Sequence, residues 1–211
     1  MSTLPVVFAN TSDIYNCAYQ MLHDYILPSL ENDVNVCLQY NFNNVNPPTN
    51  AYIPALLYCF SVIDLLGSIV YGHARSKKTS ENSIKYMQNY MGYNPDDANF
   101  IQKMYRHKMV HLAMPKAAML DKGKIISWKL HDTTNHCYLD SKDQGEIDLF
   151  GFGKIYFNGK YILNIQKFRE DISNSVITPK NGYLEKLKND VNLQYNFVLA
   201  FNQIYDPIVT D

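Results

Sequence analysis

The sequence predicts a mainly α-helical protein with a small β-hairpin appendage, and three observations lead to this prediction. Segments in both halves of the chain repeat apolar residues at helical spacing. Between about residues 122 and 168 the pattern changes to the alternation typical of β-strands. No internal repeat or low-complexity segment interrupts these patterns. We therefore expect a single domain over residues 1–211, with a helical core at about 10–120 and 180–206 and a β-hairpin insertion at about 122–168.

The first part of the chain is expected to hold three helices. Thr11, Ser12 and Asp13 are residues that cap helix N-termini, so a first helix should run from there to about Leu30. The Asn-rich stretch 41–50, which contains two prolines, is expected to be a loop. A second helix over about 52–72 is apolar nearly all round, which marks a central element. A short exposed helix should follow over 80–91.

The next helix has the clearest start in the chain. Asn94 offers a cap, Pro95 suits the first helical position, and Asp96 and Asp97 place negative charge at the positive end of the helix dipole. The apolar stripe continues to Pro115, which ends or kinks the helix. About 20 residues would make it ~30 Å long.

Strand patterns follow this helix. Residues 124–130 and 135–139 are expected to pair as one hairpin. Residues 154–157 and 160–165 are expected to form a second, because Asn158-Gly159 between them is a strong two-residue turn signal. A helical segment is predicted at about 165–173, and a last helix at about 183–205 with an apolar stripe along one face.

Composition excludes several classes of protein. With 46% apolar and 18% charged residues the chain is neither disordered nor fibrous. A net charge of −1 argues against a protein that binds nucleic acid through bulk charge, although not against a local basic site. The four cysteines form no C-x-x-C pair, so we expect free thiols in a reducing cytoplasm.

We expect a cytoplasmic protein with no membrane span. The N-terminus lacks the basic region of a secretory signal. Residues 53–71 are apolar enough to prompt a membrane test, but Asp64 lies at the middle of this segment. A carboxylate there would cost at least ~2.5 kcal/mol at the bilayer centre, so we interpret the segment as a buried core helix.

Candidate catalytic residues are clustered in the segment Arg106-His107-Lys108-Met109-Val110-His111 of the helix that is expected to begin at Pro95. The chain has three arginines and six histidines, and one arginine and two histidines fall within these six residues. Lys103 and Lys116 extend the same positive region, and Lys108 lies within it as a supporting residue beside Lys103. A guanidinium can neutralise phosphoryl oxygens and a neutral imidazole can accept a proton near pH 7, so the group suits a phosphodiester.

This six-residue motif resembles the R-x4-6-H signature of HEPN domains. Arg106 and His111 stand in the signature positions, and His107 is the polar residue after the arginine. The context is similar too, because the motif follows a long apolar helix that carries Asp64 and precedes a β insertion. The resemblance implies an HEPN-like helical bundle over roughly residues 10–120 together with the C-terminal helix.

The resemblance also implies a metal-independent endoribonuclease that needs no cofactor. His111 would be the acid or base, Arg106 would stabilise the phosphorane, and His107 would orient one of them. Asp64 could hold Arg106 or His111 from the neighbouring helix. HEPN sites are composite, so the resemblance implies a homodimer that binds RNA or a nucleotide. A toxin or defence role would add an antitoxin protein as a partner.

Several alternatives remain open at this stage. The chain could be a catalytically inactive HEPN-type module that binds a nucleotide, RNA or a protein, or the basic residues could form an ordinary solvated helix face. A zinc-protease helix is disfavoured because Lys108 stands where the H-E-x-x-H motif needs glutamate. A second cluster, in the predicted hairpin, could bind zinc but matches no standard spacing; it comprises His131, His136, Cys137 and Asp140. Tyr156 and Phe157 could stack on bases if their sheet face is exposed.

Overall fold

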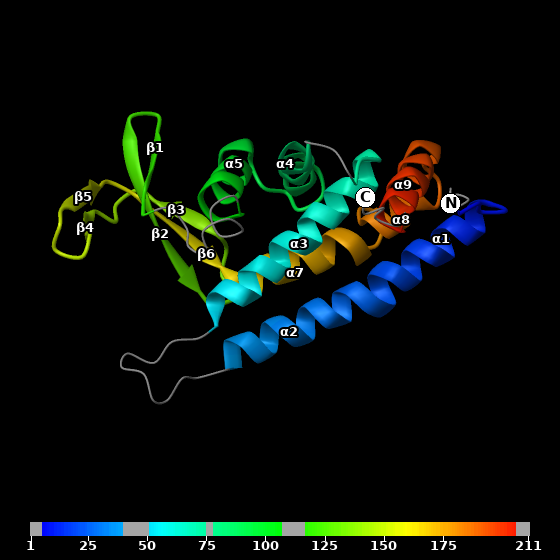
Figure 1. The fold of residues 1–211 in the computed structure, drawn as a ribbon, viewed down its shortest axis with the longest axis horizontal. Helices are drawn as coiled ribbons and strands as arrows, with labels where there is room; N and C mark the ends of the chain where they lie inside the picture. The colour runs from blue at the N-terminus through cyan, green and yellow to red at the C-terminus, as the bar shows by residue number, and fades with distance from the viewer. Residues whose placement is uncertain (1–5, 40–50, 75–77, 107–116, 206–211) are drawn as a thin grey trace, which may run out of the picture. The chain divides into compact units, whose positions relative to one another are not determined.

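The computed structural model describes residues 6–39, 51–74, 78–106 and 117–205 (Figure 1). Most of these residues are helical, and a small set of mixed strands lies between the helices, so the mainly α prediction is confirmed. The chain divides into two compact units. The first contains residues 1–30, 61–94 and 172–211, and the second contains residues 31–60 and 95–171. Three of the four boundaries fall inside the helices α2, α3 and α7, and the fourth lies between residues 94 and 95, directly before α5.

The helices and strands have the following bounds, in chain order: α1 Thr11–Tyr19, the π-helix η1 Gln20–Ile26, α2 Leu27–Gln39, α3 Tyr52–Tyr71, α4 Thr79–Asn89, α5 Pro95–Ile101, the π-helix η2 Gln102–Arg106, β1 Met119–Asp121, β2 Lys124–His131, β3 Tyr138–Asp140, β4 Gly145–Asp148, β5 Lys154–Phe157, β6 Lys160–Asn164, α7 Ile165–Ile177, α8 Tyr183–Leu187 and α9 Val191–Tyr205.

The first helix is longer than predicted. It starts at Thr11, where the Asn10 side chain accepts a hydrogen bond from the Asp13 backbone N–H at 3.0 Å, but it continues through η1 and α2 to Gln39. A π-helical turn keeps the backbone hydrogen-bonded while shifting the register of the side chains, so the chain can remain helical through this segment. The predicted loop at 41–50 lies outside the described residues.

The helix α3 agrees closely with the sequence prediction for 52–72. It is the one helix in the described part of the chain that is long and apolar enough to cross a membrane, with a mean hydropathy of 2.0 over its most apolar window. Of that window, 61% is buried inside the structure, as expected for the core helix of a soluble protein. Apolar side chains on nearly every face therefore serve packing in both units.

In the first unit, α1 and α9 lie side by side (Figure 1). Aromatic rings also pack against α4. Tyr86 and Tyr90 stack at 5.0 Å between ring centroids, and Tyr90 meets Tyr183 edge-on at 6.3 Å. The inner face of α4 is buried, so the prediction that this helix is exposed is only partly right. The predicted helix at 183–205 is broken after Leu187, because Asp190 caps a new helix through the backbone N–H groups of Asn192 and Leu193.

The second unit contains the strands, and their pairing differs from both predicted hairpins. The main sheet has the order β1-β2-β6-β3, with β2 and β6 parallel and β3 and β6 antiparallel. The segment at 154–157 pairs instead with β4 in a separate two-stranded ribbon. Asn158 and Gly159 therefore do not close a hairpin. They bond to β2, where Asn158 accepts from the Ile125 backbone N–H through its side chain at 2.8 Å.

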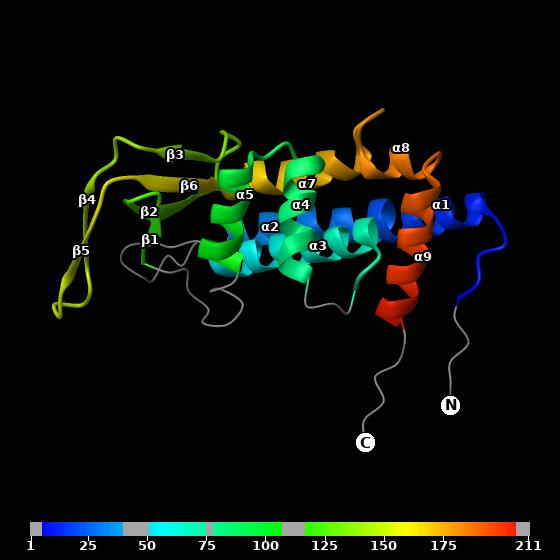
Figure 2. The same cartoon turned by 90° about the horizontal axis from the view of Figure 1, so that it is seen from above.

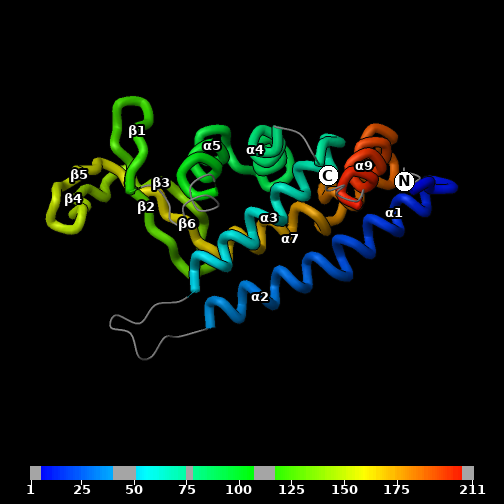
Figure 3. Tube along the Cα trace, in the orientation of Figure 1, coloured from blue at the N-terminus to red at the C-terminus, as the bar shows by residue number. Residues whose placement is uncertain are grey.

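The sheet is part of the core of the second unit rather than an appendage. In β6, Tyr161, Leu163 and Asn164 are buried, and Tyr161 stacks on Phe100 of α5 with ring centroids 4.7 Å apart. Seen from above, the β4–β5 ribbon turns away from the direction of β3 and β6 (Figure 2). The Cα trace of the ribbon ends in a tight loop beyond the main sheet (Figure 3). The prediction of a single domain over 1–211 stays a prediction.

Candidate functional site

The structure describes two residues of the predicted basic site, Lys103 and Arg106, and both belong to η2. Lys103 is exposed and Arg106 is half-buried at the last described position of the helix. His107, Lys108 and His111 lie outside the described residues, as does the predicted helix end at Pro115. The proposed grouping of Arg106 with His107 and His111 therefore stays a prediction.

The turn that carries Arg106 is anchored by aromatic contacts. Tyr105 is fully buried, and its hydroxyl donates a hydrogen bond to the backbone carbonyl of Tyr161 at 3.2 Å. The Tyr105 ring also meets Trp128 of β2 edge-on at 6.1 Å. Burial raises the pKa of Tyr105 far above its usual range, so the hydroxyl stays neutral and continues to donate. These contacts fix the backbone one residue before Arg106.

The helix begins at Pro95 as predicted, but it changes from α to π at Gln102. Isolated π-helical turns are uncommon and are often found at functional sites. In such a turn, residues four and five apart lie on nearly the same face. Gln102 and Arg106 are four apart, so they occupy neighbouring positions on η2, as they also would on an α-helix.

Gln102 is a residue that the sequence interpretation missed. Its side chain is 2% exposed, and among the described residues neither its amide nitrogen nor its amide oxygen has a hydrogen-bond partner. Buried amides are nearly always paired, because leaving one unpaired costs ~1–3 kcal/mol. The signal in the sequence was a polar residue between the apolar Phe100-Ile101 and Met104-Tyr105 pairs.

Asp64, the predicted acidic partner, belongs to the first unit. Its carboxylate accepts a hydrogen bond from the Ser83 hydroxyl of α4 at 2.6 Å. Its backbone carbonyl also accepts from the Ser68 hydroxyl at 2.7 Å. Asp64 thus joins α3 to α4, and its predicted role toward Arg106 or His111 stays a prediction.

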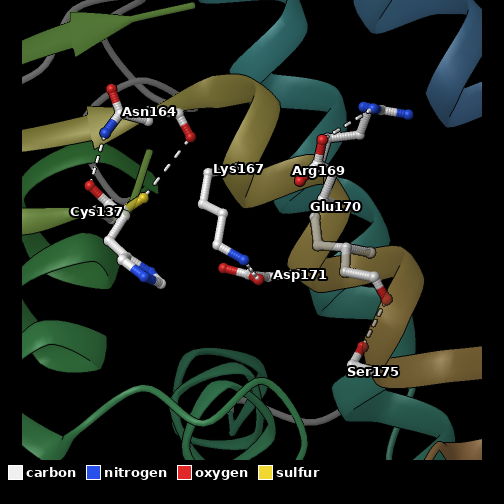
Figure 4. A network of polar contacts seen from close by, with 9 residues as sticks. Cys137, Asn164, Lys167, Arg169, Glu170, Asp171 and Ser175 are labelled. Atoms are coloured by element: carbon white, nitrogen blue, oxygen red, sulfur yellow. Dashed lines mark hydrogen bonds and ion pairs between the residues drawn. The ribbon is translucent and has the colours of Figure 1, made fainter. Parts of the chain in front are cut away.

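The predicted zinc cluster has a different set of contacts (Figure 4). The Asn164 amide donates to the His136 carbonyl at 2.7 Å, and the Cys137 thiol donates to the Asn164 carbonyl at 3.7 Å. Thr133 donates to the Asn164 side-chain oxygen at 3.0 Å. The Asn164 side chain therefore holds in place the segment that joins β2 to β3. Across the described ranges, no three His, Cys, Asp or Glu side chains are grouped in a way that could hold a metal ion.

The predicted aromatic pair at 156–157 is divided between two environments. Tyr156 is exposed, whereas Phe157 is buried against Gly145, whose missing Cβ leaves room for the ring. Both residues line a groove of about 570 Å³ together with Ile125, Gln144 and Glu146. The sequence pattern did not indicate this groove, because it depends on how β4 and β5 meet the start of β2.

In the described part of the site, Lys103 and Arg106 place two positive charges on η2, and Tyr105 of the same turn is buried in the core. A guanidinium can bind two phosphate oxygens through parallel N–H donors, and a fixed backbone limits the positions from which it can do so.

Comparison of the chain with protein-family models, with curated proteins and with solved structures found no match.

Proposed function

We propose that this chain is a metal-independent endoribonuclease of HEPN type, acting as a toxin or defence effector. The observation that carries the proposal is the position of Arg106. It is half-buried at the end of a turn whose preceding residue, Tyr105, is fixed in the core, and the sequence continues directly into His107 and His111. The mainly helical fold and the strands that follow the motif are compatible with an HEPN-like bundle.

In the proposed reaction, the ribose 2′-hydroxyl attacks the adjacent phosphorus while the bond from phosphorus to the 5′-oxygen breaks. His111 takes the proton from the 2′-hydroxyl, and the leaving 5′-oxygen gains a proton from the protonated His111 or from water, while His107 orients His111 or Arg106. The products are a 2′,3′-cyclic phosphate and a 5′-hydroxyl end. Arg106 stabilises the extra negative charge on the phosphorane, with Lys103 and Lys108 attracting the RNA backbone. The proposed enzyme is a homodimer with two copies of the motif in one cleft.

The test is RNA cleavage by the purified protein in EDTA, followed by analysis of the product ends. Replacing a positioned acid or base should slow cleavage ~10²–10⁴-fold, which is the expected result for His111→Ala. Arg106→Ala should cost a comparable factor. Arg106→Lys keeps the charge but loses the paired donors, so it should restore only part of the rate. His136→Ala is the matched control, because this exposed histidine uses its backbone carbonyl rather than its ring to hold Asn164.

Cleavage that survives EDTA, yields cyclic phosphate and disappears in the Arg106 and His111 variants would support the proposal. Equal cleavage by all variants would refute it and indicate a contaminant or another site. RNA binding that is lost in Arg106→Ala, without any cleavage by the wild-type protein, would instead identify the inactive HEPN-type binding module.

A further inference from the structure

Residues 6–8, the N-terminal strap, are held against the C-terminal helix α9. Val6 donates its backbone N–H to the side-chain oxygen of Asn202 at 2.6 Å, and the Val6 carbonyl accepts a hydrogen bond from the Asn202 amide nitrogen at 3.2 Å. The strap and α9 both belong to the first unit, and the strap leads from there into α1 (Figure 2). One side chain therefore pairs with both backbone groups of one residue, as a neighbouring strand does in a sheet.

The Asn202 amide is held in this orientation by its own helix. Its nitrogen also donates to the Val198 carbonyl, one turn earlier, at 3.1 Å. An amide nitrogen carries two protons, so these two contacts use both of them, and the amide oxygen is left to accept from the Val6 N–H. The contacts to the strap involve backbone groups alone, so any residue with a backbone N–H could take the place of Val6.

Phe8 supplies the side-chain part of the contact. Its ring centroid lies 6.2 Å from that of Phe197 and 5.7 Å from that of Phe201, in the tilted and edge-on arrangements that aromatic pairs prefer. Phe8 is half-buried, whereas Val7 before it is 84% exposed. This alternation is typical of an extended chain that turns every second side chain towards the surface beneath it.

The contact is small for a segment that has to be ordered near a chain end. One aromatic ring and two hydrogen bonds oppose the conformational entropy of the ordered residues, and chain ends are among the parts of a protein that open most readily. The aromatic face of α9 also extends beyond Phe8. The ring of Tyr205 lies 4.5 Å from that of Phe201, and Tyr205 is 61% exposed. A partner that covers Tyr205 as well would bury more apolar surface than the strap does.

We propose that this face of α9 is a peptide-binding site that the N-terminal strap occupies in cis. The partner is an extended segment of another protein, with an aromatic side chain two residues after the residue that pairs with Asn202. The aromatic side chains of α9 would receive that ring, and Asn202 would bind the backbone. Backbone pairing combined with contacts to alternate side chains is a recurring mode of peptide recognition. The proposal does not depend on the ribonuclease activity.

Binding of a fluorescently labelled peptide with the sequence of residues 4–10 tests the proposal on the full chain. The strap competes for the site, so it lowers the apparent affinity of the wild-type protein for a peptide added in trans. Phe8→Ala weakens the strap, and this variant should bind the peptide at least ~10-fold more tightly than the wild type does. A peptide in which alanine replaces the phenylalanine should not bind.

Two further substitutions, each made in the Phe8→Ala chain, distinguish this site from other surfaces of α9. Asn202→Leu keeps the approximate size of the side chain but removes both contacts to the bound backbone, so it should weaken peptide binding about 10-fold. Asn192→Leu, at an exposed position of the same helix, is the matched control and should leave binding unchanged. Circular dichroism confirms that each variant is folded.

Amide exchange in the wild-type protein gives a second readout that needs no substitution. The Val6 N–H is protected by its bond to Asn202. Millimolar peptide should displace the strap and speed exchange of this N–H, while the backbone N–H groups of α9 keep their protection.

Three results would overturn the proposal. The first is a folded Phe8→Ala chain that does not bind the peptide, or, if this variant does not fold, a Val6 N–H that stays protected at millimolar peptide. The second is peptide binding that Phe8→Ala does not strengthen or that Asn202→Leu leaves unchanged, since the peptide would then use another surface. The third is a wild-type dimer that dissociates in Phe8→Ala, which would assign this face of α9 to the strap of a second copy.

Discussion

The buried hydrogen bond between Tyr86 and Ser175 allows a stability test in which the two single substitutions have different expected costs. The two oxygen atoms are 2.7 Å apart, and Ser175 also donates its proton to the Ile172 carbonyl at 2.6 Å. A hydroxyl has one proton, so Tyr86 must be the donor and Ser175 the acceptor. Tyr86 is fully buried and Ser175 nearly so, which excludes water as a substitute partner.

Removing the acceptor should therefore cost more than removing the donor. Ser175→Ala leaves the buried Tyr86 hydroxyl without a partner, at a cost of ~1–3 kcal/mol, reduced by the ~0.5 kcal/mol by which alanine favours a helix over serine. Tyr86→Phe removes the hydroxyl itself and should cost ~0.5–1.5 kcal/mol. The double variant replaces both partners by apolar groups, so its cost should resemble that of Tyr86→Phe rather than the sum of the two.

Urea unfolding of the wild-type protein and the three variants measures these differences, provided that the m-value is unchanged. Tyr195→Phe is the matched control, because Tyr195 is exposed and its substitution should change the free energy of unfolding by less than ~0.5 kcal/mol. The reasoning is refuted if the two single costs add in the double variant within ~0.3 kcal/mol, or if Ser175→Ala costs less than Tyr86→Phe.

Three further predictions concern packing, polar contacts and thiols. Gly67→Ala should lower the melting temperature, because its Cβ would lie 3.0 Å from the Asn82 backbone carbon; the overpacking cost of ~1–3 kcal/mol should exceed the gain of ~0.5–1 kcal/mol in helix propensity, and an unchanged melting temperature would contradict this. Asn164→Ala should speed amide exchange between β2 and β3 by removing the side-chain contacts to Thr133 and His136, and unchanged exchange there would contradict it. Burial raises the pKa of Cys59 from 9.0 to about 12, so this thiol should resist alkylation in the native protein at pH 8, as mass spectrometry of the labelled peptides would show. Since the unfolded thiol loses its proton at lower pH than the folded one, the contribution of Cys59 to stability should fall from pH 9 towards 12, whereas a Cys59→Ala variant should lack this component.

Helix positions were predictable from the sequence, because their signals are local. Pro95 at the first helical position and the apolar run from Tyr52 gave helix starts that the structure confirms. The predicted segment at 165–173 is also helical, as α7. The two π-helical turns were not predictable, since they depend on the register in which buried side chains meet residues distant in the sequence. The predicted HEPN-like bundle stays a prediction.

Strand positions were also largely predictable, but their partners were not. The Asn158-Gly159 signal favours a turn between neighbouring strands, and it takes no account of a third strand that competes for the same backbone groups. In the structure β2 bonds to both residues and then continues alongside β6. The continuous apolar run Tyr161-Ile162-Leu163 was the available clue, because a strand between two partners and beneath a helix is buried on both faces.

This difference in pairing changes how the basic motif is understood. The strand β6 is paired on both sides, and its Tyr161 carbonyl accepts the hydrogen bond of Tyr105, which holds the residue before Arg106 in the core. The sequence separates these residues by 56 positions, so no local pattern could link them. The strands therefore support the basic motif, since Tyr161 of β6 and Trp128 of β2 contact Tyr105 and hold the turn that ends at Arg106. In the proposed enzyme, the rate contributed by Arg106 depends on how well that turn is fixed, because a preorganised charge stabilises a transition state without the cost of reorienting it.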